Sequence, residues 1–158
     1  SQATEIRGGM IIIQDTRETL PYTFTCIDPP PRVEVVTLRT GDYSIKGLEH
    51  LFTAERKTLQ DAFNTFGQGR ARWQRELDRM ISLQYAAVII EADWHTIVKR
   101  PPARSRLNPK TVVASIAAWS IRYPNVHFWT VPNRDFGERY TFRLIERFYK
   151  DEQRKRKN

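Results

Sequence analysis

Short apolar runs alternate along the chain with segments in which apolar residues recur every three or four positions. The β-branched run at 10–15 and the uncharged run at 85–92 predict buried strands. The second of these is expected to be central and covered on both faces, because no charge interrupts it before its end. Further strands are predicted at 33–38, 50–57 and 126–131.

Helical spacing predicts helices after the later strands. One begins after 50–57 and stops at the interruption Gly67-Gln68-Gly69. The next carries an apolar stripe of Trp73, Leu77, Met80 and Ile81. A third is capped by Asn108 with Pro109 at its first position and ends near Tyr123. It is expected to bury Val112, Val113, Ile116 and Trp119. A closing helix is predicted from about Asp135, with Glu138 as its capping-box partner.

Strands interleaved with helices predict one α/β domain over 1–158, with a mixed central sheet and helices on both faces. The folded core is expected at 10–150, and the segments 1–9 and 151–158 are expected to be loose ends. Functional groups in such sheets gather at strand ends and in the loops that follow. Asp15, Asp42 and Glu55 all fall at or near predicted strand ends.

The chain is basic, with a formal net charge of +8, which favours an anionic partner such as DNA. Its one cysteine, Cys26, cannot form an internal disulfide, so an intracellular location is predicted, in the cytoplasm and nucleoid or in a nucleus. No apolar run is long enough to span a bilayer, so no membrane partner is expected.

The segment 41–61, "GDYSIKGLEHLFTAERKTLQD", combines acids and a lysine at spacings that suit phosphodiester cleavage. Residues i and i+2 of a strand share a face, so Glu55 and Lys57 point the same way. Asp42 on a preceding turn would join them if the two strands pair as a hairpin. Two carboxylates and the substrate's own phosphate are typical ligands of Mg²⁺. The alternative from the residues alone is a solvated, charged strand edge.

Three motifs resemble the XPF-type structure-specific endonucleases, a branch of the restriction-endonuclease-like PD-(D/E)XK superfamily. "GDY…ERKTLQD" matches that family's GD-x(n)-ERK-x-x-x-D signature. "IIIQDTRE" is similar to its first strand and Val-Asp-x-Arg-Glu motif, with Gln14 in place of the usual apolar residue. "GQGRARWQREL" followed by "AAVIIEA" resembles its Gly-Arg helix and next central strand.

The resemblance implies a restriction-endonuclease-like sheet and assigns roles to individual residues. It implies six catalytic positions: Asp15, Asp42, Glu55, Arg56, Lys57 and Asp61. Asp42, Glu55 and Asp15 are the implied ligands of Mg²⁺ or Mn²⁺, and Lys57 is the implied catalytic lysine. Arg56 should point away from Glu55, so we expect it to brace the site through a salt bridge.

The residues expected to bind DNA lie outside this cluster. Arg17 and Glu18 match the first motif, and either contact phosphate or form an internal ion pair. Arg70 matches the Gly-Arg position and either reaches phosphate or staples its own helix. Arg104 and Arg106, in a proline-bearing loop, could also hold DNA, as could the basic tail or a separate partner protein. The tandem helix-hairpin-helix module that many relatives carry is not found in this sequence.

These features predict a metal-dependent DNA endonuclease that hydrolyses backbone phosphodiesters of branched or flap-like DNA with metal-activated water. A homodimer through the nuclease domain is expected, with the aromatic-rich last two helices as its face. Two alternatives remain open at this stage. One is a non-catalytic DNA-binding scaffold subunit, and the other is a restriction-like or resolvase-like nuclease with a different choice of substrate.

Overall fold

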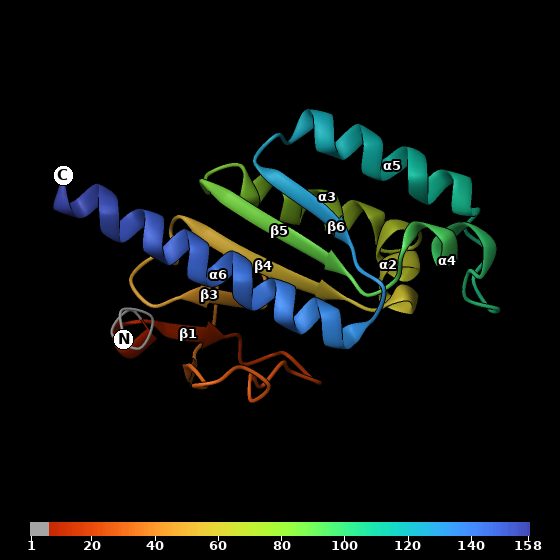
Figure 1. The fold of residues 1–158 in the computed structure, drawn as a ribbon. Helices are drawn as coiled ribbons and strands as arrows, with labels where there is room; N and C mark the ends of the chain where they lie inside the picture. The colour runs from red at the N-terminus through yellow and green to blue at the C-terminus, as the bar shows by residue number, and fades with distance from the viewer. Residues whose placement is uncertain (1–6) are drawn as a thin grey trace.

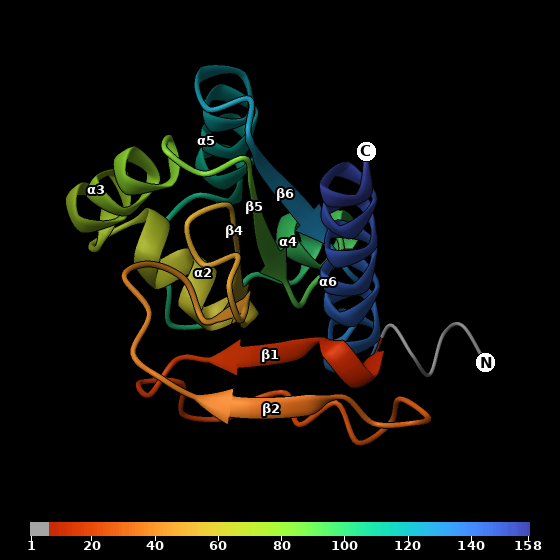
Figure 2. The ribbon, with the colours of Figure 1, turned by 90° about the vertical axis from the view of Figure 1, so that its left-hand side faces the viewer.

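One six-stranded sheet organises residues 7–158, the part of the chain that the computed structural model describes. Its strands are β1 (Ile11–Gln14), β2 (Arg32–Val35), β3 (Tyr43–Ile45), β4 (Phe52–Lys57), β5 (Tyr85–Ile90) and β6 (Val126–Thr130). They lie in the order β2-β1-β3-β4-β5-β6, with β1 to β6 seen in Figure 1 and β2 beside β1 in Figure 2. β4, β5 and β6 run parallel, as do β1 and β2, whereas β3 is antiparallel to both of its neighbours. The sheet is therefore mixed, as the sequence predicts.

Helices cover both faces of this sheet, which confirms the predicted layering (Figure 2). On one face lie α2 (Leu59–Phe66), α3 (Arg70–Met80) and α5 (Pro109–Arg122). The long helix α6 (Arg134–Lys157) covers the other face, and the short α4 (Trp94–Lys99) follows β5. None of the helices described for residues 7–158 combines the length and apolar content needed to cross a membrane.

The alternation of side chains along β5 joins its two faces to two separate cores. Ala86, Val88 and Ile90 pack with α2, α3 and α5, while Ala87 and Ile89 pack with α6. All five side chains are buried, so β5 is covered on both faces as predicted.

β4 lies beside β5 in parallel register, and this pairing decides where its charged residues point. Glu55 is opposite Val88 and Lys57 is opposite Ile90, so both belong to the face that α2 and α3 cover. Arg56 is opposite Ile89 and belongs to the α6 face. The predicted division of the acid and lysine from the arginine is confirmed.

Side-chain caps fix where the helices begin. Asn108 accepts a hydrogen bond from the Lys110 amide at 2.9 Å, with Pro109 in the first turn, as predicted for α5. For α6 the predicted capping box at Asp135 and Glu138 is wrong. Asn133 caps this helix by accepting from the Phe136 amide, and the Glu138 carboxylate accepts from the distant Phe24 amide at 2.7 Å.

Three details of the core and sheet differ from the sequence prediction. The strand expected at 33–38 ends at Val35, whose exposed side chain lies on the sheet edge. The short strand β3 was not predicted, although it links β1 to β4. Ile81, expected on the apolar stripe of α3, follows the end of the helix and is 59% exposed.

The segment 151–158 was expected to be a loose end, but α6 continues through it to Lys157. The helix persists because Glu152 is buried and accepts a hydrogen bond from Lys155 at 3.0 Å. Phe148 packs against Phe52, with 5.1 Å between ring centroids, so α6 passes the start of β4 at Phe148 and its last turns run on beyond it (Figure 1). Of the predicted loose end 1–9, residues 1–6 lie outside the described residues.

Candidate active site

The antiparallel pairing of β3 with β4 brings Asp42 next to β4, the strand that carries Glu55 and Lys57. The Asp42 amide donates to the Ala54 carbonyl at 2.8 Å, and the Asp42 carboxylate accepts from the Arg56 amide at 2.7 Å. Asp42 is thereby fixed at both its backbone and its side chain, next to Glu55. The hairpin condition set by the sequence is met, although the pairing strand is β3 rather than the one predicted at 33–38.

Gly41 is required immediately before this aspartate. Its φ is +81°, a conformation that residues with a Cβ rarely adopt. A Cβ at this position would also lie only 1.9 Å from the Thr53 hydroxyl oxygen. That hydroxyl donates to the Thr40 carbonyl at 2.9 Å, so it is held in place. Any other residue at position 41 would force the hairpin to open beside Asp42.

A cavity of about 560 Å³ opens between the end of β4 and the helices α2 and α3. Its walls are mostly polar or charged, in contrast to a typical ligand pocket. The residues lining it are Asp42, Glu55, Arg56, Lys57, Asp61, Asn64, Thr65, Gln68, Gly69, Arg72, Trp73 and Glu76. Four carboxylates therefore line one hollow of a chain that is basic as a whole.

Lys57 lies between an acid and an aromatic ring. Its ammonium nitrogen is 2.6 Å from Glu55 Oε2 and 4.2 Å from the centre of the Trp73 ring. The buried Glu55 Oε2 has the Lys57 ammonium as its charge partner, although this contact lacks the angle of a directed hydrogen bond. One ammonium balances the charge of only one carboxylate, and Asp42 and Glu76 lie beside this pair.

Crowding of carboxylates raises the proton affinity of the site. Burial, together with the negative charge of Glu55, raises the pKa of Asp42 to about 8, despite the opposing hydrogen bond from the Arg56 amide. Burial and the same neighbour raise the pKa of Glu76. The acids bind protons more tightly than free carboxyl groups because they are buried beside one another. The positive charge of Lys57 offsets only part of this effect.

Glu76 is a site residue that sequence reasoning missed. It projects from α3 into the cavity, close enough to Glu55 for the charge of Glu55 to raise its pKa. The signal that could have identified it is its spacing, because positions 73, 76 and 80 share one side of a helix. Trp73 and Met80 are buried on that side, which places Glu76 over β4.

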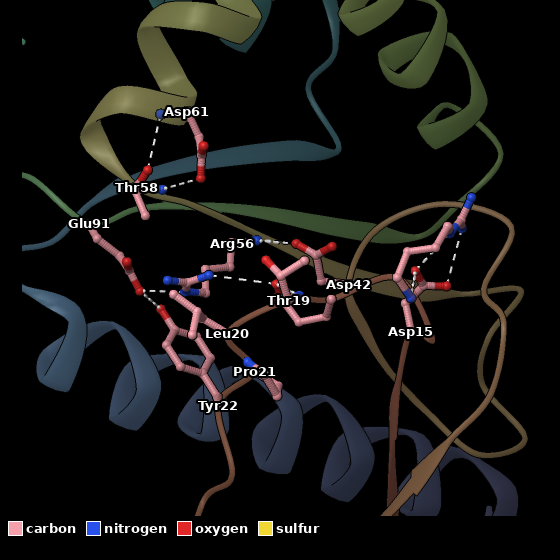
Figure 3. A network of polar contacts seen from close by, with 12 residues as sticks. Asp15, Thr19, Leu20, Pro21, Tyr22, Asp42, Arg56, Thr58, Asp61 and Glu91 are labelled. Carbon is pink, nitrogen blue, oxygen red and sulfur yellow. Dashed lines mark hydrogen bonds and ion pairs between the residues drawn. The ribbon is translucent and has the colours of Figure 1, made fainter.

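Asp15 is not brought into the cavity. Its carboxylate accepts hydrogen bonds from the Arg17 side chain at 2.9 and 3.1 Å and from the Leu38 amide at 2.7 Å. Burial would raise the pKa of Asp15, but these hydrogen bonds outweigh it and hold the pKa below its usual range. Asp15 is a neighbour of Asp42, whose carbonyl accepts from the Asp15 amide at 2.7 Å, but the Asp15 carboxylate is turned to Arg17 (Figure 3). Of the two roles left open for Arg17, the internal ion pair is the one observed.

The predicted three-carboxylate ligand set including Asp15 is therefore not assembled. Within residues 7–158, no group of three or more histidine, cysteine, aspartate or glutamate side chains is placed to hold a metal ion. Asp42 and Glu55 remain as the pair of predicted ligands that share the cavity.

Arg56 points to the other side of the sheet, as expected (Figure 3). Its guanidinium donates to Glu91 at 2.9 Å and lies 3.6 Å from Glu18. Tyr22 donates to the same Glu91 carboxylate, and its ring lies under the guanidinium. These contacts brace the strand from behind, so Arg56 contributes only its amide to the cavity side.

Asp61 has a structural contact that explains its position in the motif. Its carboxylate accepts from the Thr58 amide at 3.3 Å, while the Thr58 hydroxyl accepts from the Asp61 amide at 3.0 Å (Figure 3). This reciprocal pair is a capping box that starts α2 directly after β4. The exposed side chain of Asp61 also lines the cavity.

The arginines predicted to bind DNA fall into two groups. Arg70 donates to Ser115 at 2.8 Å and to the Phe66 carbonyl, and its guanidinium lies over the Trp119 ring. It therefore joins α3 to α5 instead of facing the cavity. Arg104 and Arg106 are exposed in the loop before α5.

Comparison with known proteins gives matches in family and fold. The ERCC4 domain matches residues 14–144. Among solved structures, XPF from Aeropyrum pernix superposes with a TM-score of 0.65 and 20% sequence identity, covering 89% of this chain. The chain spans 60% of the length of that structure. Comparison with curated proteins gives no match.

Proposed function

The chain belongs to the ERCC4 domain family and has the fold of an XPF-type nuclease domain, and on this premise we propose that it is a Mg²⁺- or Mn²⁺-dependent DNA endonuclease. The observation that carries the proposal is the acidic cavity at the end of β4, where Asp42 and Glu55 lie beside Lys57. The proposed reaction is hydrolysis of a backbone phosphodiester, and the proposed substrates are branched or flap-like DNA.

The donor set of the cavity suits a hard divalent cation. Asp42 and Glu55 supply carboxylate oxygens, and the Lys57 ammonium, 2.6 Å from Glu55, balances the charge of only one of them. Two protein carboxylates are the usual number for Mg²⁺, which keeps several waters and takes phosphate oxygens from its substrate. When bound, the cation would neutralise the scissile phosphate and lower the pKa of the attacking water.

The remaining side chains of the cavity would act on the substrate directly. The Lys57 ammonium is held by Glu55 and Trp73 at a fixed point, where it can orient the phosphate and offset the negative charge that develops on it. Arg72, exposed at the rim, would contact the phosphate backbone. Glu76 would contribute a third negative charge next to Glu55 and thereby raise cation affinity.

An assay on flap, fork, four-way-junction and linear duplexes tests the proposal. We expect cleavage of at least one substrate with Mg²⁺ or Mn²⁺ and none when EDTA replaces the metal. The preferred substrate would then identify the nuclease type, because a restriction-like enzyme would cut linear duplex in preference to branched DNA. DNA binding without cleavage under any divalent cation would contradict the proposal and support a scaffold subunit instead.

We also propose a homodimer, now centred on the edge strand β6 and not on α5 and α6 jointly, because these helices cover opposite faces of the sheet (Figure 2). A cavity of about 440 Å³ is lined mainly by apolar residues of β6 and α5, together with Trp94. Ile121 is 80% exposed on α5, and Phe136 is 48% exposed at the start of α6. Exposed apolar residues around an open sheet edge favour burial by a partner.

Light scattering of Ile121→Glu tests the dimer. We expect the wild type to have twice the mass of one chain at micromolar concentration. A buried glutamate would weaken association at least about tenfold and shift the variant toward the mass of one chain. Ile81→Glu is the matched control, because Ile81 is also exposed but follows α3. A monomeric wild type, or equal effects of both substitutions, would contradict this interface.

We also propose that a separate protein chain helps to bind the DNA or to recruit the nuclease to it. Arg17 and Arg70 are engaged in internal contacts, so of the four arginines predicted to bind DNA only Arg104 and Arg106 are left for the substrate. Action on DNA would place the protein wherever its substrate lies, in the cytoplasm and nucleoid or in a nucleus, as the sequence predicts.

A further inference from the structure

A second, smaller cavity adjoins the acidic one. It has a volume of about 400 Å³ and lies between the end of α2 and the loop before α5. Its lining residues are Phe63, Asn64, Gly67, Gln68, Arg104, Ser105, Arg106 and Leu107. We call it the arginine pocket. No carboxylate lines it, which contrasts with the four acids next door.

The two hollows share a wall, so they form one continuous surface. Asn64 and Gln68 line both of them, and both side chains are exposed. The side-chain oxygen Oδ1 of Asn64 accepts a hydrogen bond from the Gln60 side chain at 3.0 Å. The side-chain NH₂ group of Asn64 is therefore free to donate outward. A chain of phosphates entering one hollow would therefore pass amide donors before reaching the other.

The arginines of this pocket are available for a ligand. Within residues 7–158, neither Arg104 nor Arg106 forms an ion pair, in contrast to Arg17 and Arg56, which are both neutralised by acids. Two unneutralised guanidiniums beside each other repel, and a phosphate backbone relieves that repulsion.

The loop that carries them is anchored to the core. Leu107 packs against the cluster beneath α2 and α5, and its amide donates to the Ser105 hydroxyl at 3.2 Å. Asn108 then caps α5 directly. Leu107 also covers the end of α2, where a Cβ on Gly67 would lie in ordinary van der Waals contact with it, at 3.5 Å. An anchored loop loses less freedom on binding than a mobile one.

We propose that one DNA strand runs from the acidic cavity across Asn64 and Gln68, and that its next phosphates bind Arg104 and Arg106. This inference rests on the proposed function, because it takes the ligand of the acidic cavity to be DNA. It goes further by assigning the strand a path over the protein surface and by assigning a binding site to the phosphates beside the scissile one. It also assigns the grip to the arginine pocket and not to the basic end of α6.

Fluorescence anisotropy with a labelled single-stranded oligonucleotide tests the site. The protein is kept in EDTA, so that binding is measured without cleavage. We expect Arg104→Ala with Arg106→Ala to raise the Kd about tenfold. The slope of log affinity against log salt should fall by roughly 1.4, about 0.7 for each lost phosphate contact to a single strand.

Arg154→Ala with Arg156→Ala is the matched control, because it removes the same charge from exposed positions at the end of α6. We expect less than a twofold change in Kd for this pair. Thermal unfolding of both variants verifies that each is folded. Equal weakening by both pairs, or an unchanged Kd after loss of Arg104 and Arg106, would overturn the inference.

This binding experiment separates the inference from the proposed function. A protein that binds the oligonucleotide through these arginines but cuts nothing would support the pocket and refute the nuclease. A protein that cuts DNA with the same Kd and salt slope in the double variant would retain the nuclease and refute the pocket.

Discussion

Replacing Glu55 by glutamine is expected to lower the rate of DNA cleavage at least about 1,000-fold, a loss of roughly 4 kcal/mol of transition-state stabilisation. The variant removes the negative charge that faces Asp42 and Lys57, while keeping the size of the side chain. Cleavage is measured as a single-turnover rate on the preferred substrate at saturating Mn²⁺.

The same variant should not lose stability. Burial and then the charge of Glu55 raise the pKa of Asp42, and burial and Glu55 likewise raise the pKa of Glu76. Loss of the Glu55 charge relieves both repulsions, and Lys57, which loses its partner at 2.6 Å, keeps these two acids as neighbours. The free energy of unfolding in urea without metal should be unchanged or higher by about 1 kcal/mol. The wild type should gain stability on addition of Mn²⁺, and the variant should gain less.

Glu49→Gln is the control for this experiment, since Glu49 is exposed and does not line the acidic cavity. It should cleave at the wild-type rate. Metal-dependent cleavage by Glu55→Gln within tenfold of the wild type would contradict the assignment of Glu55 as a metal ligand.

Replacing Lys57 by methionine should lower the cleavage rate about 100-fold to 1,000-fold, because an ammonium held beside the phosphate is lost. Its effect on stability should have the opposite sign to that of Glu55→Gln. Without Lys57, Glu55 has no positive neighbour at 2.6 Å and still lies beside Asp42 and Glu76. We expect the free energy of unfolding to fall by roughly 1–3 kcal/mol in EDTA, and Mn²⁺ to restore much of it.

The affinity for DNA should change little in Lys57→Met, because only one contact at the reacting phosphate is removed. Lys46→Met provides the control, since Lys46 pairs with Glu34 on the exposed surface. A Lys57→Met protein that is as active as wild type would refute the role of the ammonium. One that is inactive and also no longer stabilised by Mn²⁺ would show that Lys57 supports the cation site and does not act on the phosphate.

The separation of faces along β4 could be predicted from sequence because it depends only on strand periodicity. Glu55 and Lys57 lie together and Arg56 lies opposite in the structure, where it is braced by Glu91 and Glu18. The sequence could not identify these two acids as the partners of Arg56, because they come from segments distant in the chain.

Other errors have local causes that periodicity does not reveal. β3 has only three residues, which is too short for a recognisable alternation. Asp15 does stand at the end of its strand, but Arg17, two residues later, folds back onto its carboxylate. Glu76 was missed because its helical spacing shows only that it shares a side of α3 with Trp73 and Met80, and not that this side packs over β4.

The long helix α6 has a practical consequence for single-molecule work. It passes the start of β4 at Phe148 and its final turns run on beyond that end of the strand, whereas Lys57 stands at the opposite end of β4 (Figure 1). A surface tether or fluorescent tag attached after Lys157 would therefore sit away from the acidic cavity. A protein immobilised in this way should leave the acidic cavity open to DNA in solution.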